Sequence, residues 1–167
     1  MTAAYIALGS NLGDRNKNIE RSVNFLKELS GITVKRMSSV YETDSEGGPP
    51  QDKFLNGVLE IETTLLPDEL LDRLKGIESR MGRSSEDEPN SPRPIDLDIL
   101  LYADIVISGG RMKIPHPKMH QRLFVLKGLC EIAPDVLHPK LRKTSKELYD
   151  DLVAVNEGRS GESNQVS

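Results

Sequence analysis

Two aspartates, Asp96 and Asp98, stand two residues apart at the start of an apolar run that continues to Tyr102. Residues i and i+2 of a β-strand point to the same face, so the two carboxylates are expected side by side. Like charges at this distance repel each other unless a cation lies between them. Mg²⁺ prefers oxygen ligands and commonly takes one or two carboxylates together with phosphate oxygens. The pair is a candidate magnesium site, and a solvated strand end with an Asp–Arg ion pair is the alternative.

Basic side chains surround this aspartate pair in the sequence. Arg83 and Arg93 flank the polar segment that leads into it, and a guanidinium fork suits phosphate. If these residues bind phosphate, several of their donor groups must point to one place. The alternative is that each of them is a solvated surface residue. Further candidate donors follow along the chain: Arg111, Lys113 and Arg122. His116 lies between two prolines that restrict its backbone, which suits either a positioned side chain or a turn histidine.

Two other metal or nucleotide motifs are disfavoured. His116 and His120 have the spacing of a helical zinc pair, but Pro117 between them interrupts a regular helix. The chain also lacks the sequence Gly-x-x-x-x-Gly-Lys-Ser/Thr, which excludes a P-loop. The turn at residues 9–14 is weakly glycine-rich, which suits either a tight turn or a phosphate at the next helix N-terminus.

The composition describes an acidic chain of 167 residues with a formal charge of −4. This length predicts one domain with room for a core, and the acidic balance argues against a general nucleic-acid binder. The single Cys130 can form no internal disulfide, which suits a reducing compartment. The sequence shows no signal-peptide pattern and no apolar run near the roughly 20 residues that span a bilayer. We therefore expect a cytoplasmic monomer without a membrane segment.

The hydrophobic pattern predicts the elements that must position these residues. Strands are expected at 3–8, 32–41, 54–63 and 96–102, with helices at 14–29 and 67–81. This order is the ferredoxin-like βαββαβ unit, an α+β fold whose antiparallel sheet is flanked by helices in three layers. An added hairpin at 105–114, a helix at 118–132 and a final helix after Thr144 are expected beyond it. We expect residues 1–156 to form a single domain and residues 157–167 to form a flexible tail.

The predicted topology brings distant segments to one edge of the sheet. The two crossovers and the hairpin place the ends of the first two strands beside the starts of the last two. Two long loops, 43–53 and 83–94, lie at this edge together with the aspartate pair. Loops of this length in a compact domain are commonly lids or binding loops. The same edge carries Phe54 and Asn56, and Phe124 could pair with Phe54 around a flat heterocycle. Core packing is the alternative for both phenylalanines.

Five blocks in this order resemble the 6-hydroxymethyl-7,8-dihydropterin pyrophosphokinase family of folate biosynthesis. They lie at 7–14, 54–56, 78–83, 92–99 and 115–124, and the most specific is Arg-Pro-Ile-Asp-Leu-Asp-Ile. The resemblance extends over roughly residues 3 to 139. It implies transfer of the β,γ-diphosphate of ATP to the pterin hydroxymethyl group with release of AMP. It also implies two Mg²⁺ ions at Asp96 and Asp98.

The resemblance further implies a role for each matching residue. The pterin would lie between Phe54 and Phe124, with its edge read by Asn56 and by backbone near Thr43. The nucleotide phosphates would meet Arg83, Arg93, His116 and Arg122, and the rest of the ATP site would be lined by Leu71, Ile99 and Arg111. The implied catalytic residues are Arg83, Arg93, Asp96 and Asp98, and one of the two aspartates is the candidate base if a base acts.

The chain departs from the family pattern in the second long loop. Ser85 and Asn90 stand where some members carry an arginine and a tryptophan, and residues 84–88 are acidic. We expect a weaker closing loop or slower turnover. Two other classes remain open on the residues alone: another Mg²⁺-dependent nucleotidyl- or phosphotransferase, and a non-catalytic ferredoxin-like binding module.

Overall fold

The computed structural model describes residues 1–45, 50–83, 87–88 and 91–166, with side chains described up to residue 158. Its helices and strands follow one another as β1 Thr2–Ser10, α1 Arg15–Glu28, β2 Ile32–Met37, β3 Tyr41–Thr43, β4 Phe54–Thr63, α2 Pro67–Arg80, β5 Asp96–Tyr102, the 3₁₀ helix η1 Met119–Gln121, α3 Leu123–Ile132, β6 Leu137–His138, β7 Lys143–Thr144 and α4 Ser145–Val166.

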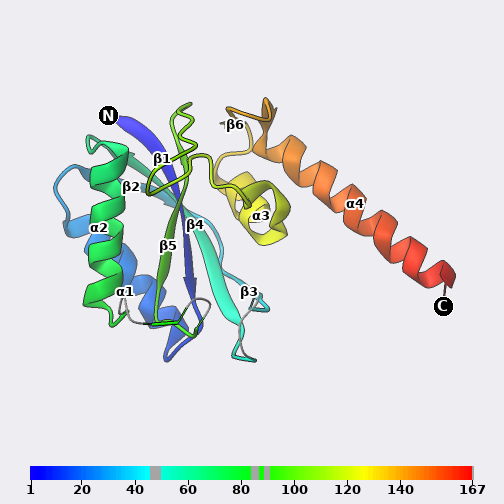
Figure 1. Cartoon of the computed structure of the whole chain (residues 1–167), viewed down its shortest axis with the longest axis horizontal. Coiled ribbons are helices and arrows are strands. Elements are labelled where there is room, and N and C mark those ends of the chain that lie inside the picture. The colour runs from blue at the N-terminus through cyan, green and yellow to red at the C-terminus, as the bar shows by residue number, and fades with distance from the viewer. Residues whose placement is uncertain (46–49, 84–86, 89–90, 167) are drawn as a thin grey trace.

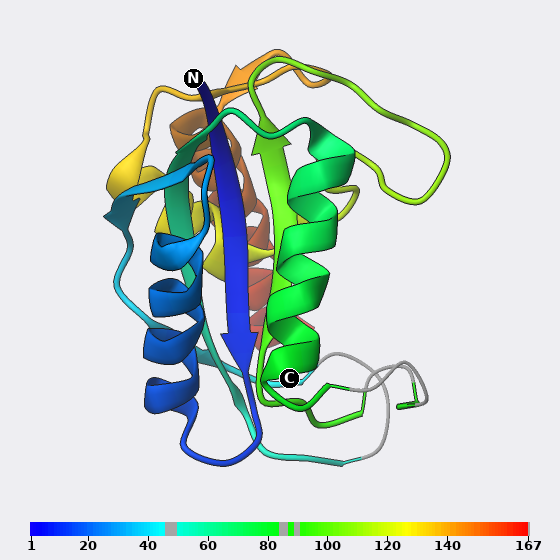
Figure 2. The ribbon, with the colours of Figure 1, turned by 90° about the vertical axis from the view of Figure 1, so that its left-hand side faces the viewer.

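One antiparallel sheet with the strand order β2-β4-β1-β5 forms the centre of the molecule, and the short β3 pairs with the first residues of β4. Helices α1 and α2 cover one face of this sheet, and α3 lies on the other (Figure 1). Figure 2 shows α1 and α2 side by side in front of the sheet, with β1 between them. The predicted α+β ferredoxin-like fold is confirmed.

The alternation of side chains on the strands divides the core in two. On β1, Ile6 packs toward α1 and α2, whereas Tyr5 packs toward α3. On β5, Leu97 and Ile99 point to the α2 side and are nearly fully buried. Asp96 and Asp98 therefore share the opposite face, as the period of a strand predicts.

The predicted strand at 32–41 is wrong in its middle. Met37 pairs with Leu59 and Tyr41 pairs with Asn56, so this strand advances four residues while β4 advances three. The Ser38 hydroxyl accepts a hydrogen bond from the Val58 amide at 2.8 Å. The Ser38 hydroxyl thus takes the place of a backbone carbonyl as the acceptor for Val58. This irregularity in the ladder separates β2 from β3.

Two later predictions also differ from the structure, and one pair of short strands was not predicted. The expected hairpin at 105–114 is reduced, within the described residues, to a bridge between Ile107 and Ile114. The expected helix at 118–132 is divided at Arg122, whose extended backbone separates η1 from α3. The sequence did not predict the two-residue strands β6 and β7, which pair with each other.

The final helix is longer than expected. Helix α4 continues to Val166 and extends away from the sheet (Figure 1). The helix includes most of residues 157–167, which the sequence predicted to be a flexible tail. The flexibility of these residues stays a prediction. Among the described residues, no helix is both long enough and apolar enough to cross a membrane.

Candidate active site

The predicted edge of the sheet is the place where the candidate residues meet. Gly9 at the end of β1 pairs with Asn56 of β4 on one side and with Asp96 of β5 on the other. A Cβ atom on Gly9 would lie 3.2 Å from the Asn56 Oδ1 atom and 3.4 Å from the Phe54 ring. The glycine therefore permits the close approach of these side chains.

A first cavity of about 280 Å³ opens at this edge. It brings together most of the candidates for the pterin and phosphate sites. They are Thr43, Phe54, Asn56, Arg93, Asp96, Asp98, His116, Arg122 and Phe124.

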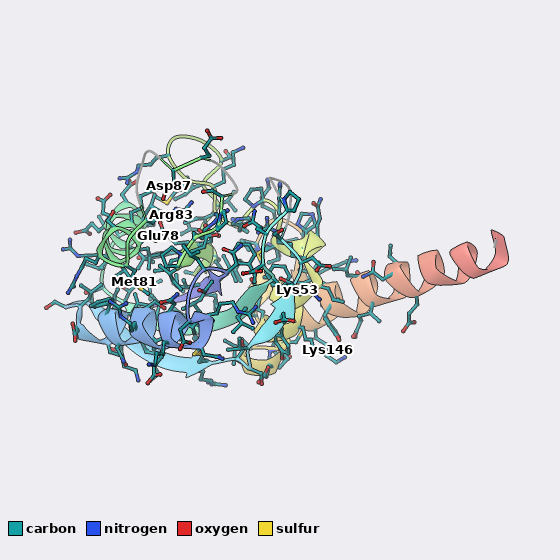
Figure 3. The ribbon with its side chains drawn as sticks, turned by 90° about the horizontal axis from the view of Figure 1, so that it is seen from below. Lys53, Glu78, Met81, Arg83, Asp87 and Lys146 are labelled. Carbon is teal, nitrogen blue, oxygen red and sulfur yellow. The ribbon has the colours of Figure 1, made fainter. Side chains whose placement is uncertain are left out.

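A second cavity, of about 480 Å³, lies between α2 and β5. Leu71 and Arg83 line it, together with the acidic side chains Glu78, Asp87 and Glu88. Figure 3 shows Glu78, Arg83 and Asp87 near one another beside α2. Asp96 and Asp98 line both cavities, so the aspartate pair forms a boundary between them.

Two arginines neutralise the first aspartate of the pair. Arg83 donates a hydrogen bond to Asp96 Oδ1 at 2.7 Å, and Arg93 lies 3.5 Å from Asp96 Oδ2. Burial alone would lower the pKa of Arg83, but the hydrogen bond and charge of Asp96 outweigh it and the pKa is raised. Guanidinium forks in this position also suit the oxygens of a phosphate.

The second aspartate has an unusual ionisation. Burial, together with the nearby charges of Asp96 and Glu78, raises the pKa of Asp98 to about 7. Arg122 and Arg83 oppose this rise but do not cancel it. At neutral pH, Asp98 is therefore balanced between a neutral carboxyl and a carboxylate, and a bound cation would favour the carboxylate.

Glu78, which the sequence analysis gave no role, supports the aspartate strand from α2. Its Oε2 atom accepts a hydrogen bond from the Leu97 amide at 2.8 Å and lies 3.3 Å from the Arg83 guanidinium. Burial raises the pKa of Glu78, and the bond from Leu97 opposes that rise. Its signal in the sequence is a glutamate among the apolar positions of a helix, next to Ile77.

The wall formed by β3 and β4 presents Asn56 to the first cavity. Asn56 is 8% exposed, and its Nδ2 atom donates to the Thr43 hydroxyl at 2.6 Å and to the Tyr41 carbonyl at 3.4 Å. The Arg93 guanidinium lies 5.6 Å from the centre of the Phe54 ring. This contact places an arginine beside the aromatic candidate for heterocycle stacking.

A residue of the glycine-rich turn joins the two long loops. Asn11 is 2% exposed, and its Oδ1 atom accepts from the Arg93 amide at 2.9 Å. Its Nδ2 atom donates to the Gln51 side chain and to the Asp52 carbonyl. Sequence reasoning missed this role, because these bonds connect residues about 40 and 80 positions apart.

Some predicted site residues lie elsewhere or outside the described chain. Ile99 belongs to the core beneath α2, and Arg111 forms an ion pair with Asp72 at 2.6 Å. Neither lines the two cavities as the described residues define them. Ser85 and Asn90, the departures in the second loop, lie outside the described residues.

Comparison with known proteins points to one family. The family model of 7,8-dihydro-6-hydroxymethylpterin-pyrophosphokinase matches residues 5–134. The 2-amino-4-hydroxy-6-hydroxymethyldihydropteridine pyrophosphokinase of Aquifex aeolicus is 44% identical over 147 residues, which cover 88% of this chain and 90% of that protein. The Bacillus subtilis protein of the same name is 43% identical over 158 residues, which cover 95% of this chain and 92% of that protein.

A solved structure supports the fold alone. The Plasmodium falciparum HPPK-DHPS with pteroate has a TM-score of 0.76 at 17% identity and covers 96% of this chain. This chain spans 44% of that longer one. The match to the family model and the two relatives above 40% identity establish the family of this chain, and the fold is consistent with it. The chain belongs to the 7,8-dihydro-6-hydroxymethylpterin-pyrophosphokinase family.

Proposed function

We propose that the chain transfers the β,γ-diphosphate of ATP to the hydroxymethyl group of 6-hydroxymethyl-7,8-dihydropterin in folate biosynthesis, with AMP as the second product. Membership of the family supports a diphosphotransferase that uses ATP. The observation that carries the proposal is the position of Asp96 and Asp98, which line both cavities. Two substrates bound on either side of this boundary would meet at the carboxylates.

We assign the first cavity to the pterin. Phe54 and Phe124 line it and offer flat apolar surfaces, and Asn56 offers an amide that can both donate and accept at the heterocycle edge. Thr43 is adjacent, through its hydrogen bond with Asn56. Because Asn56 is buried, the polar atoms of its side-chain amide need hydrogen-bond partners, and a ligand with a polar edge can supply them.

We assign the second cavity to the nucleotide. Leu71 would face the adenosine, and the phosphates would extend toward Arg83 and Arg93. His116 and Arg122 line the first cavity beside the aspartates, where they can meet the terminal phosphates. The His116 Nδ1 atom accepts from the Lys118 amide at 3.1 Å, which leaves Nε2 to carry the donor proton.

The donor set at the boundary fits Mg²⁺. The described part of the chain holds no group of three or more histidine, cysteine and acidic side chains that could enclose an ion alone. Two carboxylates with open positions suit an ion that shares phosphate oxygens, and we propose two such ions. Their chemistry would be to neutralise charge on the phosphate chain. The raised pKa of Asp98 is consistent with a site that ionises fully when a cation binds.

The proposed step forms one bond and breaks one. The pterin hydroxymethyl oxygen attacks the β-phosphorus, and the bond from this phosphorus to the α–β bridging oxygen breaks. The electron pair leaves on AMP, where the arginines stabilise the new charge. The proton of the hydroxymethyl group passes to Asp98 or Asp96 if a base acts, or to water. Holding the two substrates in line supplies much of the rate enhancement.

We further propose the state in which the protein works. Residues 1–156 form its single domain, residues 157–167 are a flexible tail, and the protein is a cytoplasmic monomer with two small-molecule substrates. It binds neither nucleic acid nor membrane. The net charge of −4 supports the first of these exclusions.

The test is a product assay with ATP, Mg²⁺ and 6-hydroxymethyl-7,8-dihydropterin. We expect AMP and the pterin diphosphate in equal amounts, and neither in the presence of a chelator. The Asp96→Asn variant should lose activity by at least about 100-fold while its fold is retained. Formation of ADP in place of AMP, or full activity in that variant, would overturn the proposal.

A further inference from the structure

A carboxylate at the end of α3 holds the segment between β2 and β3. The Glu131 Oε1 atom accepts hydrogen bonds from the Ser39 amide at 2.9 Å and from the Ser39 hydroxyl at 2.7 Å. The Oε2 atom accepts from the Tyr41 hydroxyl. The hydrogen bond from Ser39, and to a smaller extent the one from Tyr41, lowers the pKa of Glu131. The contact joins residues about 90 positions apart in the sequence.

The held segment leads directly to one wall of the first cavity. Tyr41 pairs with Asn56 across the ladder, and Thr43 pairs with Phe54. The Asn56 amide donates to both the Tyr41 carbonyl and the Thr43 hydroxyl. A shift of Tyr41 would therefore change the position of the side chains that read the heterocycle edge.

The helix that carries Glu131 also carries the opposite wall. Phe124 precedes Glu131 by seven residues, or about two helical turns, so both lie on one side of α3. A Cβ atom on Gly128, between them, would lie 2.8 Å from the Val58 side chain of β4. The glycine fixes how closely α3 approaches the sheet, and Glu131 fixes β3 relative to α3.

We infer that Glu131 is a positioning residue that sets the spacing between the Asn56–Thr43 wall and the Phe124 wall of the first cavity. This spacing sets how the polar edge of a heterocycle that lies against Phe124 meets Asn56 and Thr43. The inference rests on the proposed function, because it assigns that cavity to the pterin. Glu131 does not line the cavity itself and acts through Ser39 and Tyr41.

A second contact from the same helix supports this role. The Lys127 ammonium group lies 4.7 Å from the centre of the Tyr41 ring. Tyr41 therefore meets α3 through its ring and through its hydroxyl. The hydrogen bonds of Glu131 are exposed to solvent, and bonds of this kind add little to global stability. Their geometric effect on the cavity is thus separable from an effect on folding.

The test compares Glu131→Ala, Glu131→Gln and a matched control, Glu147→Ala. Glu147 forms a comparable exposed contact, because its Oε1 atom accepts from the Thr144 amide at 3.1 Å, but it lines neither cavity. The Kd of 6-hydroxymethyl-7,8-dihydropterin is measured in the presence of Mg²⁺ and a non-hydrolysable ATP analogue. The Kd of the analogue and the Tm are measured in parallel.

We expect Glu131→Ala to raise the pterin Kd about tenfold and to leave the nucleotide Kd within about twofold. Glu131→Gln keeps an acceptor for Ser39 and should raise the pterin Kd by only about threefold. Glu147→Ala should change neither Kd. Hydrogen exchange at residues 41–43 should increase in Glu131→Ala and stay unchanged in Glu147→Ala.

Two outcomes of the binding measurements would overturn the inference. One is an unchanged pterin Kd in Glu131→Ala. The other is an equal weakening of both ligands with a fall in Tm larger than that of Glu147→Ala, which would mean general loosening. A wild-type protein that binds no pterin contradicts the proposed function instead. In that case unchanged hydrogen exchange at residues 41–43 in Glu131→Ala would still overturn the positioning role.

Discussion

At the scale of single residues, the site depends on how charge is arranged around two carboxylates. Asp96 is paired with two arginines, whereas Asp98 is partly buried and has a pKa raised to about 7. Neighbouring carboxylates that differ in this way have different roles in a reaction. The paired aspartate is held by the two arginines, and the other can release or take up a proton near neutral pH.

The metal-free protein should lose stability as the pH rises. The pKa of Asp98 lies above its ordinary value of 3.8 in the folded state, so the folded protein binds this proton more tightly than the unfolded chain. Its contribution is fully present below about pH 4 and is lost as the pH rises through about 7. We expect Asp98→Asn to be more stable than wild type by about 1–3 kcal/mol at pH 8.

Urea denaturation of both proteins in EDTA at pH 4 and pH 8 measures this difference. The gap between variant and wild type should be small at pH 4 and large at pH 8. Addition of Mg²⁺ at pH 8 should stabilise the wild type more than the variant. A gap that is equal at the two pH values would contradict the raised pKa of Asp98.

Arg83 should contribute to the rate more than to substrate affinity. It contacts Asp96 and Glu78 and lines the second cavity, so its loss removes a positive charge from the place where the reaction adds negative charge. We expect Arg83→Ala to lower kcat about 100- to 1,000-fold. Steady-state kinetics measures this, with Arg80→Ala as the control, because Arg80 stacks on the Phe25 ring instead. A fall in kcat of less than about threefold would remove Arg83 from the reaction.

Residue types and spacing predicted which side chains would meet, because a strand has a fixed period and the family motif is specific. The same period also places Ile99 on the core face of β5, opposite the aspartates, where the structure has it buried. Neither residue types nor spacing predicted the Arg111–Asp72 ion pair, which joins positions 39 residues apart. Contacts of this kind depend on packing that no local pattern records.

At the scale of elements, the position of α3 on the sheet shapes the first cavity. A methyl group on Gly128 would lie 2.8 Å from a Val58 methyl and 3.2 Å from the Ser38 hydroxyl. Gly128→Ala should therefore displace α3 and cost about 1–3 kcal/mol of unfolding free energy, in spite of the better helix propensity of alanine. It should also weaken pterin binding through Phe124.

Denaturation and a pterin titration check this prediction. Gly76→Ala on α2 is the matched control, because a Cβ atom there meets nothing within 4 Å. That variant should be neutral or slightly stabilising and should bind pterin normally. Equal effects of the two substitutions would show that the contact of α3 with β4 is not tight.

The existence and type of the main elements followed from hydrophobic period and from turn residues. The bounds of β4 were predicted without error, because apolar and β-branched positions end at clear breaks. The division between β2 and β3 was missed, since Ser38 enters the ladder through its hydroxyl. The division between η1 and α3 was missed because the extended backbone of Arg122 has no signature in the sequence.

At the scale of the whole molecule, the topology predicted one active edge, and the structure adds the connections within it. Asn11 connects the segment at Gln51 and Asp52 with the segment at Arg93. Arg15 donates to the Lys53 carbonyl at 2.8 Å and so connects α1 to the same region. These bonds make the two loops one unit.

Asn11→Ala should therefore disturb both loops at once. We expect kcat/KM to fall about tenfold or more for both ATP and the pterin, because each buried hydrogen bond lost leaves an unpaired polar group. Steady-state kinetics with each substrate varied in turn measures the effect. An effect confined to one substrate would mean that the loops act independently.

The most direct test of the proposed reaction follows a single atom. ATP that carries ¹⁸O at the α–β bridging position is incubated with Mg²⁺, the pterin alcohol and the protein, and both products are analysed by mass spectrometry. Attack at the β-phosphorus predicts that the bridging label is found in AMP and not in the pterin product. Label in the pterin product, or ADP in place of AMP, would contradict diphosphate transfer by this chain.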